Sequence, residues 1–433
     1  MSDKRPVKRL EAARRSGAHI KEDFMTLGPR VAQGEPLVLT GAMTPMEIFR
    51  AMDIPYLVKP WWMGVVNAKQ LGGKMYGYLK DAGYRDDMCS YCTMSLACAH
   101  DPHPEEGPWG GMPRPTILLG GSDGVGCSSY FKLDELEAEA LGAKLYSMHQ
   151  FKQANFDCPD NWWEKEEKHW EDLQSKERTD FYEQEVRLLV NFLENETGRK
   201  LDKNKLIHVL NNVNEQEHYN KLVRDLVART RPAPAVISDT INAVQQAQWL
   251  RGTDWAVEHA KRFYEEVKAL ADQGIGAVPN EQVRLMWIGR GLWHDMVFYQ
   301  HFEEKYGAAF IWTMYMGLGA DGYPRHHVEE NPFRNIAARM SLIEEFLHTP
   351  KYCAQWYKNQ AITNQIDGVV YLVPENCMAN GDLAYNIIRE LESADIPVCV
   401  LRSDPADAKQ WSEEAMVAAV EDLIENRILV KRK

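Results

Sequence analysis

Three cysteines lie within ten positions of one another in the stretch MCSYCTMSLACAH, residues 88–100: Cys89, Cys92 and Cys98. The N-terminal stretch MSDKRPVKRLEAARRSGAHIKED is basic and lacks the apolar core of an export signal, so we expect reduced thiols and read clustered cysteines as metal ligands or reactive groups. The spacing Cys-x2-Cys-x5-Cys matches neither structural zinc sites nor bacterial ferredoxins. The segment therefore does not form a complete metal site by itself.

Two further cysteines follow predicted strands. The loop after TILLGG (116–121) ends in Cys127, and the loop after GVVYLVPEN (368–376) ends in Cys377. Each stands at a predicted helix start, where partial positive charge favours thiolate, although small cysteines also pack well at strand ends. A site built from three distant loops would take one thiolate from each. Thiolates from separate loops favour iron–sulfur, and zinc completed by His100 or His103 stays open as an alternative.

The remaining cysteines have no partners at ligand spacing. Cys158 falls in a predicted loop, Cys353 in a helical pattern and Cys399 in a terminal strand. We interpret these three as structural.

A recurring unit positions the loops. A β-branched run leads into a loop, an amphipathic helix and a second apolar run, and this happens four times: 36–58, 116–148, 283–315 and 368–401. Strands that alternate with helices indicate parallel sheets covered by helices, whose ligands bind beyond the carboxyl ends of the strands. The predicted fold is α/β, with two Rossmann-like (flavodoxin-like) parallel-sheet lobes joined by a helical segment.

The predicted organisation has four parts. Long charged amphipathic runs replace strand signals in the middle of the chain, with Gly198 and Gly274 as C-cap glycines and Pro232 as a break. We take the basic N-terminus as a solvated, poorly ordered arm. The parts are an N-terminal arm (1–34), a first α/β lobe (35–159), a helical insert or connector (160–275) and a second α/β lobe with a C-terminal helix (276–433).

The composition limits the kinds of partner that the protein is expected to bind. The 433 residues carry a formal net charge of -13 and a pI near 5.5, which repels nucleic acid and anionic lipid surfaces. No apolar run approaches the roughly 20 residues that span a bilayer. We therefore expect a cytoplasmic protein with neither a nucleic-acid nor a membrane partner.

Several stretches together resemble one known family. CSYC, SDGVGCSSYFK and DGVVYLVPENCMANGDLAYNIIRELESADIPVCVLRSD are similar to the benzoyl-CoA reductase and 2-hydroxyacyl-CoA dehydratase family. TPMEIFRAMDIPYL looks like the proline and glutamate helix start of that family. The chain length and the KPWW segment look most like its larger substrate-side type, the B subunit of ATP-dependent benzoyl-CoA reductase.

The resemblance implies a site. Its members hold a 4Fe-4S cluster through three cysteines and leave one iron position open, which implies Cys89, Cys127 and Cys377 as ligands, with Cys92 as the alternative to Cys89. Glu47 is a candidate for proton handling or support near the cluster, and capping of its helix is the plainer interpretation. Independently of the resemblance, the stretch Arg325 to His327 beside the glycine-rich GLGADGYP loop could donate a proton or bind a CoA phosphate, and a surface loop is the interpretation we favour.

The resemblance also implies a reaction and partners. The implied function is ATP-dependent, ferredoxin-driven reduction of benzoyl-CoA to a cyclohexadiene-carboxyl-CoA in anaerobic aromatic degradation. The alternatives are a 2-hydroxyacyl-CoA dehydratase subunit, and a zinc-stabilised assembly subunit without an active site. The chain has no GxxxxGK[ST] or GxGxxG motif, so ATP is expected on separate activating iron–sulfur subunits, beside a related smaller substrate-side subunit and ferredoxin.

Aromatic residues suggest dry surroundings for such a centre. Trp61 and Trp62 lie in KPWWMGVV and Trp312 lies in FIWTMYMG. Burial away from water helps to keep a cluster strongly reducing. Plain core packing is the alternative interpretation of these three side chains, and the one we favour.

Overall fold

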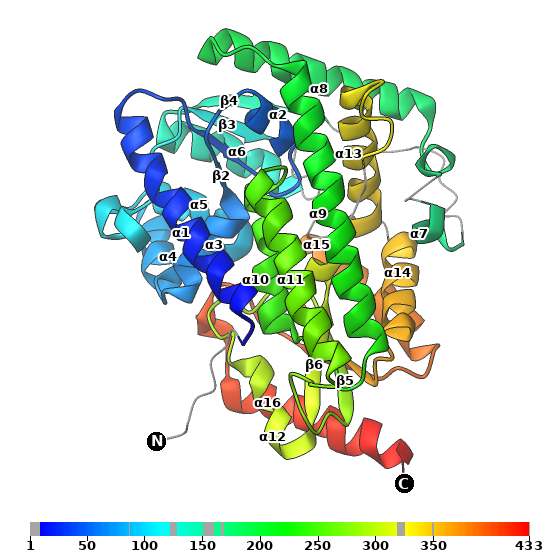
Figure 1. The fold of residues 1–433 in the computed structure, drawn as a ribbon. Helices are drawn as coiled ribbons and strands as arrows, with labels where there is room; N and C mark the ends of the chain where they lie inside the picture. The colour runs from blue at the N-terminus through cyan, green and yellow to red at the C-terminus, as the bar shows by residue number, and fades with distance from the viewer. Residues whose placement is uncertain are drawn as a thin grey trace.

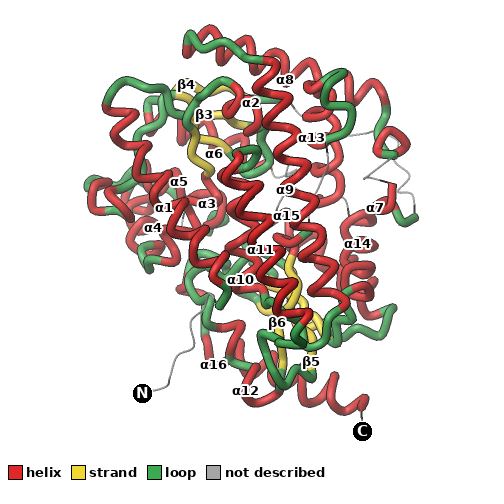
Figure 2. The backbone as a smooth tube through the Cα atoms, in the orientation of Figure 1, coloured by secondary structure: helices red, strands yellow, loops and turns green. Residues whose placement is uncertain are grey.

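A computed structural model describes residues 9–85, 87–121, 128–149, 160–165, 169–317, 325–348 and 350–432. Its strands form two separate all-parallel sheets of four strands each, seen as two yellow groups in Figure 2. The strands are β1 (Val38–Thr40), β2 (Tyr56–Val58), β3 (Ile117–Gly120), β4 (Lys144–Ser147), β5 (Val283–Ile288), β6 (Ala308–Thr313), β7 (Gly368–Leu372) and β8 (Val398–Leu401). Every strand lies inside one of the four predicted units, and the α/β two-lobe prediction is confirmed.

The two sheets share one topology. The first has the order β2-β1-β3-β4 and the second has the order β6-β5-β7-β8, with every neighbouring pair parallel. All residues of the central strands β1, β3, β5 and β7 are buried, as expected of parallel strands covered on both faces. After β2 and β6 the chain returns to the other side of the first strand, so the strand order reverses between β1 and β3 and between β5 and β7. The loops after these strands therefore border the place where such sheets bind ligands.

Helices surround each sheet (Figure 1). The first lobe contains an additional group of three helices between β2 and β3, of which α5 packs against α6 and α3. Its helices are α2 (Met46–Ala51), α3 (Lys59–Ala68), α4 (Gly72–Asp81), α5 (Ser90–Ala99) and α6 (Ser128–Leu141). Those of the second lobe are α12 (Glu303–Tyr306), α13 (Pro332–His348), α14 (Pro350–Thr363), α15 (Met378–Glu392) and α16 (Glu413–Asp422).

Helices also make up the described part of the connecting segment. Gly198 ends α8 with a φ of 68°, and Gly274 follows α11 with a φ of 67°, as predicted for C-terminal glycines. Pro232 lies in the break between α9 and α10. The helices of this segment are the short α7 (Trp162–Lys165), followed by α8 (Lys176–Thr197), α9 (Lys203–Arg229), α10 (Ile237–Leu250) and α11 (Asp254–Asp272). The exact domain boundaries stay a prediction.

The N-terminal segment differs from the expected solvated arm. Residues Glu11–Ala32 form α1, a long helix that packs against α10 and α11. Its buried residues include Ile20, Phe24 and Leu27, which recur at helical spacing. The Arg9 guanidinium pairs with Glu303 at 2.6 Å, which ties this end of the chain to the second lobe. The high density of Lys and Arg had masked the apolar stripe.

Membrane-spanning helices are absent from the described part of the chain. None of its helices combines the length and the apolar character that crossing a bilayer requires.

Candidate metal centre

Thiols from the two lobes meet at one place. Cys89 is the N-cap of α5 in the first lobe, and Cys377 directly precedes α15 in the second. The Cys89 sulfur lies within hydrogen-bonding reach of the Cys377 thiol and of the Cys92 thiol, one turn along α5. The structure therefore brings together two of the three predicted ligands, together with the predicted alternative.

The surroundings of Cys89 favour its thiolate. Hydrogen bonds from the thiols of Cys377 and Cys92 hold the pKa of Cys89 well below its usual range, against the opposing effect of burial. The backbone N–H groups of Cys92 and Tyr91 act in the same direction because they belong to the first turn of α5. A thiolate is the form in which cysteine binds metals.

Hydrogen bonds join the segments on either side of these cysteines. The Asn376 amide donates to the Met88 carbonyl at 3.0 Å and to the Asp404 carboxylate at 3.3 Å. The Ser90 hydroxyl donates to the other oxygen of Asp404. A residue adjacent to Cys89 and a residue adjacent to Cys377 thus share one buried acceptor.

An aromatic and cationic group borders the thiols. The Arg290 guanidinium, two residues beyond β5, lies 4.6 Å from the centre of the Tyr91 ring. The buried Tyr315 hydroxyl is within hydrogen-bonding reach of both Tyr91 and Arg290. Because Tyr91 stands between Cys89 and Cys92, a positive charge of the second lobe lies close to the thiol-bearing turn of the first.

Cys127, the third predicted ligand, lies outside the described residues, but the strand before its loop is well anchored. The backbone N–H of Gly121 donates to Asp134 Oδ2 at 3.0 Å, and Asp134 Oδ1 accepts from the Lys59 ammonium at 2.5 Å. Glu137 lies on the other side of Lys59, and burial raises the pKa of its carboxyl group. This buried network joins α3 and α6 to the end of β3.

The other described cysteines are packed. Cys98 lies against Trp62, and burial raises the pKa of its thiol to about 12. Burial also raises the pKa of Cys353, and that of Cys399 to about 11, which suits the structural role predicted for both. Cys158 lies outside the described residues.

The predicted tryptophans belong to the core. Trp62 and Trp312 are buried, and Trp61 stacks on Trp249 of α10 with ring centres 4.6 Å apart. Core packing was the interpretation we favoured, and Trp62 in addition supports α5 through its contact with Cys98.

Glu47 takes part in a buried ion pair. It is in the first turn of α2, fully buried, and its carboxylate accepts from Arg325 at 2.5 Å, with Arg251 Nε at 3.5 Å. Arg325 is therefore not part of a surface loop, whereas His327 is exposed. Two more guanidinium contacts hold the loop after β1: Arg251 donates to the Thr44 carbonyl and Arg339 to the Met43 carbonyl.

The zinc alternative gains no support from the two histidines. His100 and His103 follow the C-terminal end of α5, about 15 Å of helix away from Cys89. Among the described residues no group of three or more His, Cys, Asp or Glu side chains is arranged to hold a metal ion. What the described residues do offer is a set of converging soft thiols, one of them with a strongly lowered pKa, and this donor chemistry fits an iron–sulfur group.

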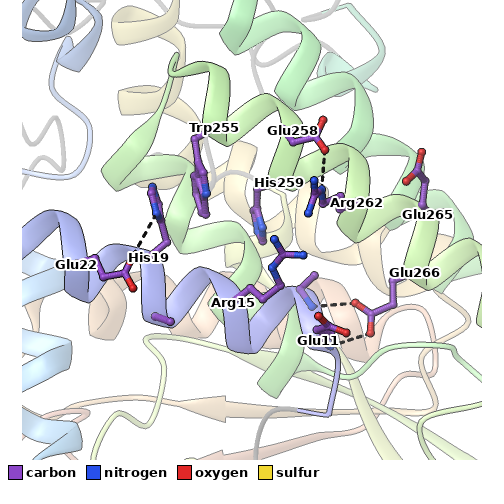
Figure 3. Close-up of a pocket in the computed structure, with 12 residues that line it drawn as sticks. Glu11, Arg15, His19, Glu22, Trp255, Glu258, His259, Arg262, Glu265 and Glu266 are labelled. Atoms are coloured by element: carbon purple, nitrogen blue, oxygen red, sulfur yellow. Dashed lines mark hydrogen bonds and ion pairs between the residues drawn. The ribbon is translucent and has the colours of Figure 1, made fainter.

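A cavity lies away from the thiols, between α1 and α11. It has a volume of about 610 Å³, and no predicted site residue lines it. The rings of His19, Trp255 and His259 stack in sequence there, with centres 4.0 and 4.9 Å apart, while Arg15 and several glutamates surround them (Figure 3). Its carboxylates outnumber its guanidinium groups, and it shares no residue with the thiol group.

Sequence reasoning did not find the side chains that hold the site together. Asp404, Asn376 and Arg290 show no local motif, and their contacts with Ser90, Met88 and Tyr91 join residues of different lobes that are far apart in the sequence. The turn-forming stretch SDPAD after the last strand was the one available signal, because a loop at that end of a parallel sheet is a place for functional residues.

Most of the chain is similar to known proteins. The family model described as 2-hydroxyglutaryl-CoA dehydratase, D-component, matches residues 42–426, which include every described strand except β1 and all three thiols that meet. The (R)-phenyllactyl-CoA dehydratase alpha subunit of Clostridium sporogenes is 22% identical over 403 residues, which cover 93% of this chain and 91% of that protein. The chain therefore belongs to the 2-hydroxyglutaryl-CoA dehydratase D-component family, within the 2-hydroxyacyl-CoA dehydratases that its motifs resemble.

Proposed function

We propose that this chain is the iron–sulfur, substrate-side subunit of an enzyme that transforms a CoA thioester by one-electron chemistry. The observation that carries the proposal is the meeting of Cys89 and Cys377, which come from different lobes and share no local motif. Because each thiol is supplied by a separate loop, their approach is a property of the whole fold and not of one folded turn.

The proposed ligands are Cys89, Cys127 and Cys377, with Cys92 as the alternative to Cys89. When bound, a 4Fe-4S cluster with one open iron position supplies one-electron transfer and a place for substrate. The chain's own residues present a thiolate at Cys89, and Tyr91, between Cys89 and Cys92, contacts Arg290 and Tyr315 of the second lobe. Glu47 is retained as a candidate for support, through its ion pair with Arg325.

Dehydration of a 2-hydroxyacyl-CoA is the first candidate reaction. It is supported by the family model over residues 42–426 and by the dehydratase alpha subunit aligned over most of both chains. In this reaction the electron is returned after each turnover, so no net reduction accompanies loss of water.

Reduction of benzoyl-CoA to a cyclohexadiene-carboxyl-CoA is the second candidate. It is supported by the resemblance of the KPWW segment and of the DGVVYLVPENCMANGDLAYNIIRELESADIPVCVLRSD stretch to the B subunit of the ATP-dependent reductase. The proposed partners are the same for both reactions: a related smaller subunit, ATP-binding iron–sulfur activating subunits and a low-potential donor such as ferredoxin.

An anoxic assay of the co-purified complex separates the candidates. The complex is given ATP and reduced ferredoxin, and 2-hydroxyacyl-CoA and benzoyl-CoA substrates are followed by mass. Loss of water from the hydroxyacyl-CoA without net consumption of electrons identifies a dehydratase. A gain of two hydrogens by benzoyl-CoA, coupled to ATP hydrolysis, identifies a reductase.

Substitution of cysteines tests the ligands. We expect Cys377→Ser and Cys127→Ser to lose iron, acid-labile sulfide and activity together, because each removes a proposed thiolate ligand. The matched control is Cys399→Ser, which should keep all three because that thiol is packed against α16. Cys89→Ala compared with Cys92→Ala decides between these two thiols. Full iron in both Cys127→Ser and Cys377→Ser, or zinc without sulfide in the unsubstituted protein, would contradict the proposal.

A further inference from the structure

Asp404 is a buried carboxylate that lies on neither of the cysteine-bearing segments that meet. It follows the last strand, β8, by three residues, and its side chain has no exposure to solvent. Its own turn orients it, since the backbone N–H groups of Ala406 and Asp407 each donate to Oδ1 at 2.8 Å. These two hydrogen bonds fix the orientation of the carboxylate independently of the other lobe.

This fixed carboxylate contacts the neighbours of two predicted ligands. Its Oδ1 accepts from Ser90, the residue after Cys89, and its Oδ2 accepts from the Asn376 amide, the residue before Cys377, at 3.3 Å. The first of these contacts crosses from the second lobe to the first. The second remains inside the second lobe and holds the loop between β7 and α15.

Asn376 closes the arrangement. Its amide nitrogen also donates to the Met88 carbonyl at 3.0 Å, so the backbone before Cys89 is bound to the same amide that Asp404 orients. The residues on both sides of Cys89 are therefore fixed relative to the residue before Cys377.

Resting on the function proposed above, we propose that Asp404 is a positioning residue of the metal centre, which fixes the Cys89 thiol of the first lobe relative to the Cys377 thiol of the second. It acts through Ser90 and Asn376 and touches neither sulfur itself. Such a role explains why a carboxylate is buried completely at a seam between lobes: four donors satisfy it, and two of them are the side chains next to the ligands.

The first experiment needs no cluster. Cluster-free full-length protein is treated with a mild thiol oxidant, and the disulfides Cys89–Cys377 and Cys89–Cys92 are quantified by mass spectrometry of peptides. The local Cys89–Cys92 pair lies within α5 and its cap and serves as an internal reference. We expect Asp404→Asn to lower the ratio of the first disulfide to the second about tenfold, because the introduced amide nitrogen faces the Asn376 amide, which needs an acceptor there.

A neighbouring carboxylate provides the control. Asp407 accepts a hydrogen bond from the Lys409 backbone at 3.0 Å within the same turn. Asp407→Asn removes a similar charge three residues away and should leave the disulfide ratio unchanged. Ser90→Ala removes one of the two connections without altering any charge and should lower the ratio in the same direction, which keeps the test valid if Asp404→Asn does not fold.

The second experiment uses the cluster-loaded protein. Iron, acid-labile sulfide, the EPR spectrum and the midpoint potential are measured for the same variants. Asp404→Asn should retain less iron and give an altered EPR spectrum and a higher midpoint potential, whereas Asp407→Asn should keep the unsubstituted iron content and spectrum. Loss of fold alone would not change the potential or the spectrum of the clusters that remain.

The outcomes are distinguishable. If Asp404→Asn and Ser90→Ala both keep the disulfide ratio, and the loaded variants keep the iron content, spectrum and potential, the positioning role is wrong. If the unsubstituted protein binds no iron and sulfide, the proposed function fails, and the disulfide ratio still decides whether Asp404 fixes the two thiols relative to each other.

Discussion

At the scale of single residues, the surroundings of a side chain decide its chemistry. Cys89 and Cys353 are the same residue type, yet hydrogen bonds from neighbouring thiols lower the pKa of the first while burial raises that of the second. Sequence spacing predicted different roles for these two, because one is clustered at a helix start and the other lies within a helix. It gave no sign of Asp404, whose role depends on residues that are distant in sequence.

His259 supports a prediction about pH at this scale. Burial lowers the pKa of its imidazole to about 4, and the charges of Arg15 and His19 on α1 act in the same direction. As the pH falls, the unfolded chain binds this proton near pH 6.5, whereas the folded protein binds it only near pH 4. Protonation of His259 therefore leaves the free energy of unfolding unaffected above pH 6.5 and lowers it as the pH falls from 6.5 toward 4. From pH 7.5 to pH 5 this residue should reduce the free energy of unfolding by about 2 kcal/mol.

The measurement compares urea unfolding of the unsubstituted protein with that of His259→Phe at both pH values. Phenylalanine keeps the stack between Trp255 and Phe263 and cannot bind a proton. The variant should lose about 2 kcal/mol less than the unsubstituted protein between the two pH values. An equal loss in both proteins would show that His259 does not contribute.

At the scale of elements, hydrophobic pattern located the strands and missed the first helix. The eight strands of the described residues fall in the predicted units because most of them are short apolar runs with distinct boundaries. In α1, charged residues are interspersed among the apolar ones, and the stripe is recognised only when α10 and α11 are present to cover it. The approach of the Cys89 and Cys377 loops was implied by the family resemblance, whereas no local pattern records the hydrogen bonds by which those loops are joined.

Gly289 supports a prediction about a strand end. It follows β5 with a φ of 107°, and a Cβ there would lie 2.6 Å from the Leu372 carbonyl oxygen at the end of β7. Gly289→Ala should lower the unfolding free energy by about 3 kcal/mol and reduce iron binding, because it displaces the strand end before Cys377. Thermal unfolding and iron analysis measure both effects.

Gly198 is the matched position for this substitution. It also has a positive φ, of 68°, but a Cβ there meets no atom within 4 Å. Gly198→Ala should therefore cost only about 1 kcal/mol and leave iron binding intact. Equal effects of the two substitutions would mean that backbone strain, and not the contact with β7, governs the result at Gly289.

At the scale of the whole molecule, the candidate centre joins two lobes of the same topology. A cluster bound to Cys89 and Cys377 would connect α5 in the first lobe to the loop before α15 in the second. Ligand binding to the folded state alone stabilises that state, and the gain falls on the segments that the ligand connects.

Removal of the cluster therefore has an expected signature. Amide hydrogen exchange should accelerate in the first turn of α5 and in residues 374–377 and 403–407, while the stack of α9 against α11 keeps its protection. The comparison is between anoxic loaded protein and the same protein after chelation, with Cys399→Ser as a loaded control. Uniform acceleration across both lobes would instead indicate global destabilisation.

The separation of the two thiols in the sequence also determines when each becomes available during synthesis. Cys89 and Cys377 are 288 residues apart in the chain and approach each other only after β7 and the loop that follows it have been made. At ribosomal rates of about 5 to 20 residues per second, Cys377 is synthesised roughly 15 to 60 seconds after Cys89. During that interval Cys89 lacks the hydrogen bond from Cys377 that contributes most to its lowered pKa, so its thiolate is fully favoured only after the second lobe has been made.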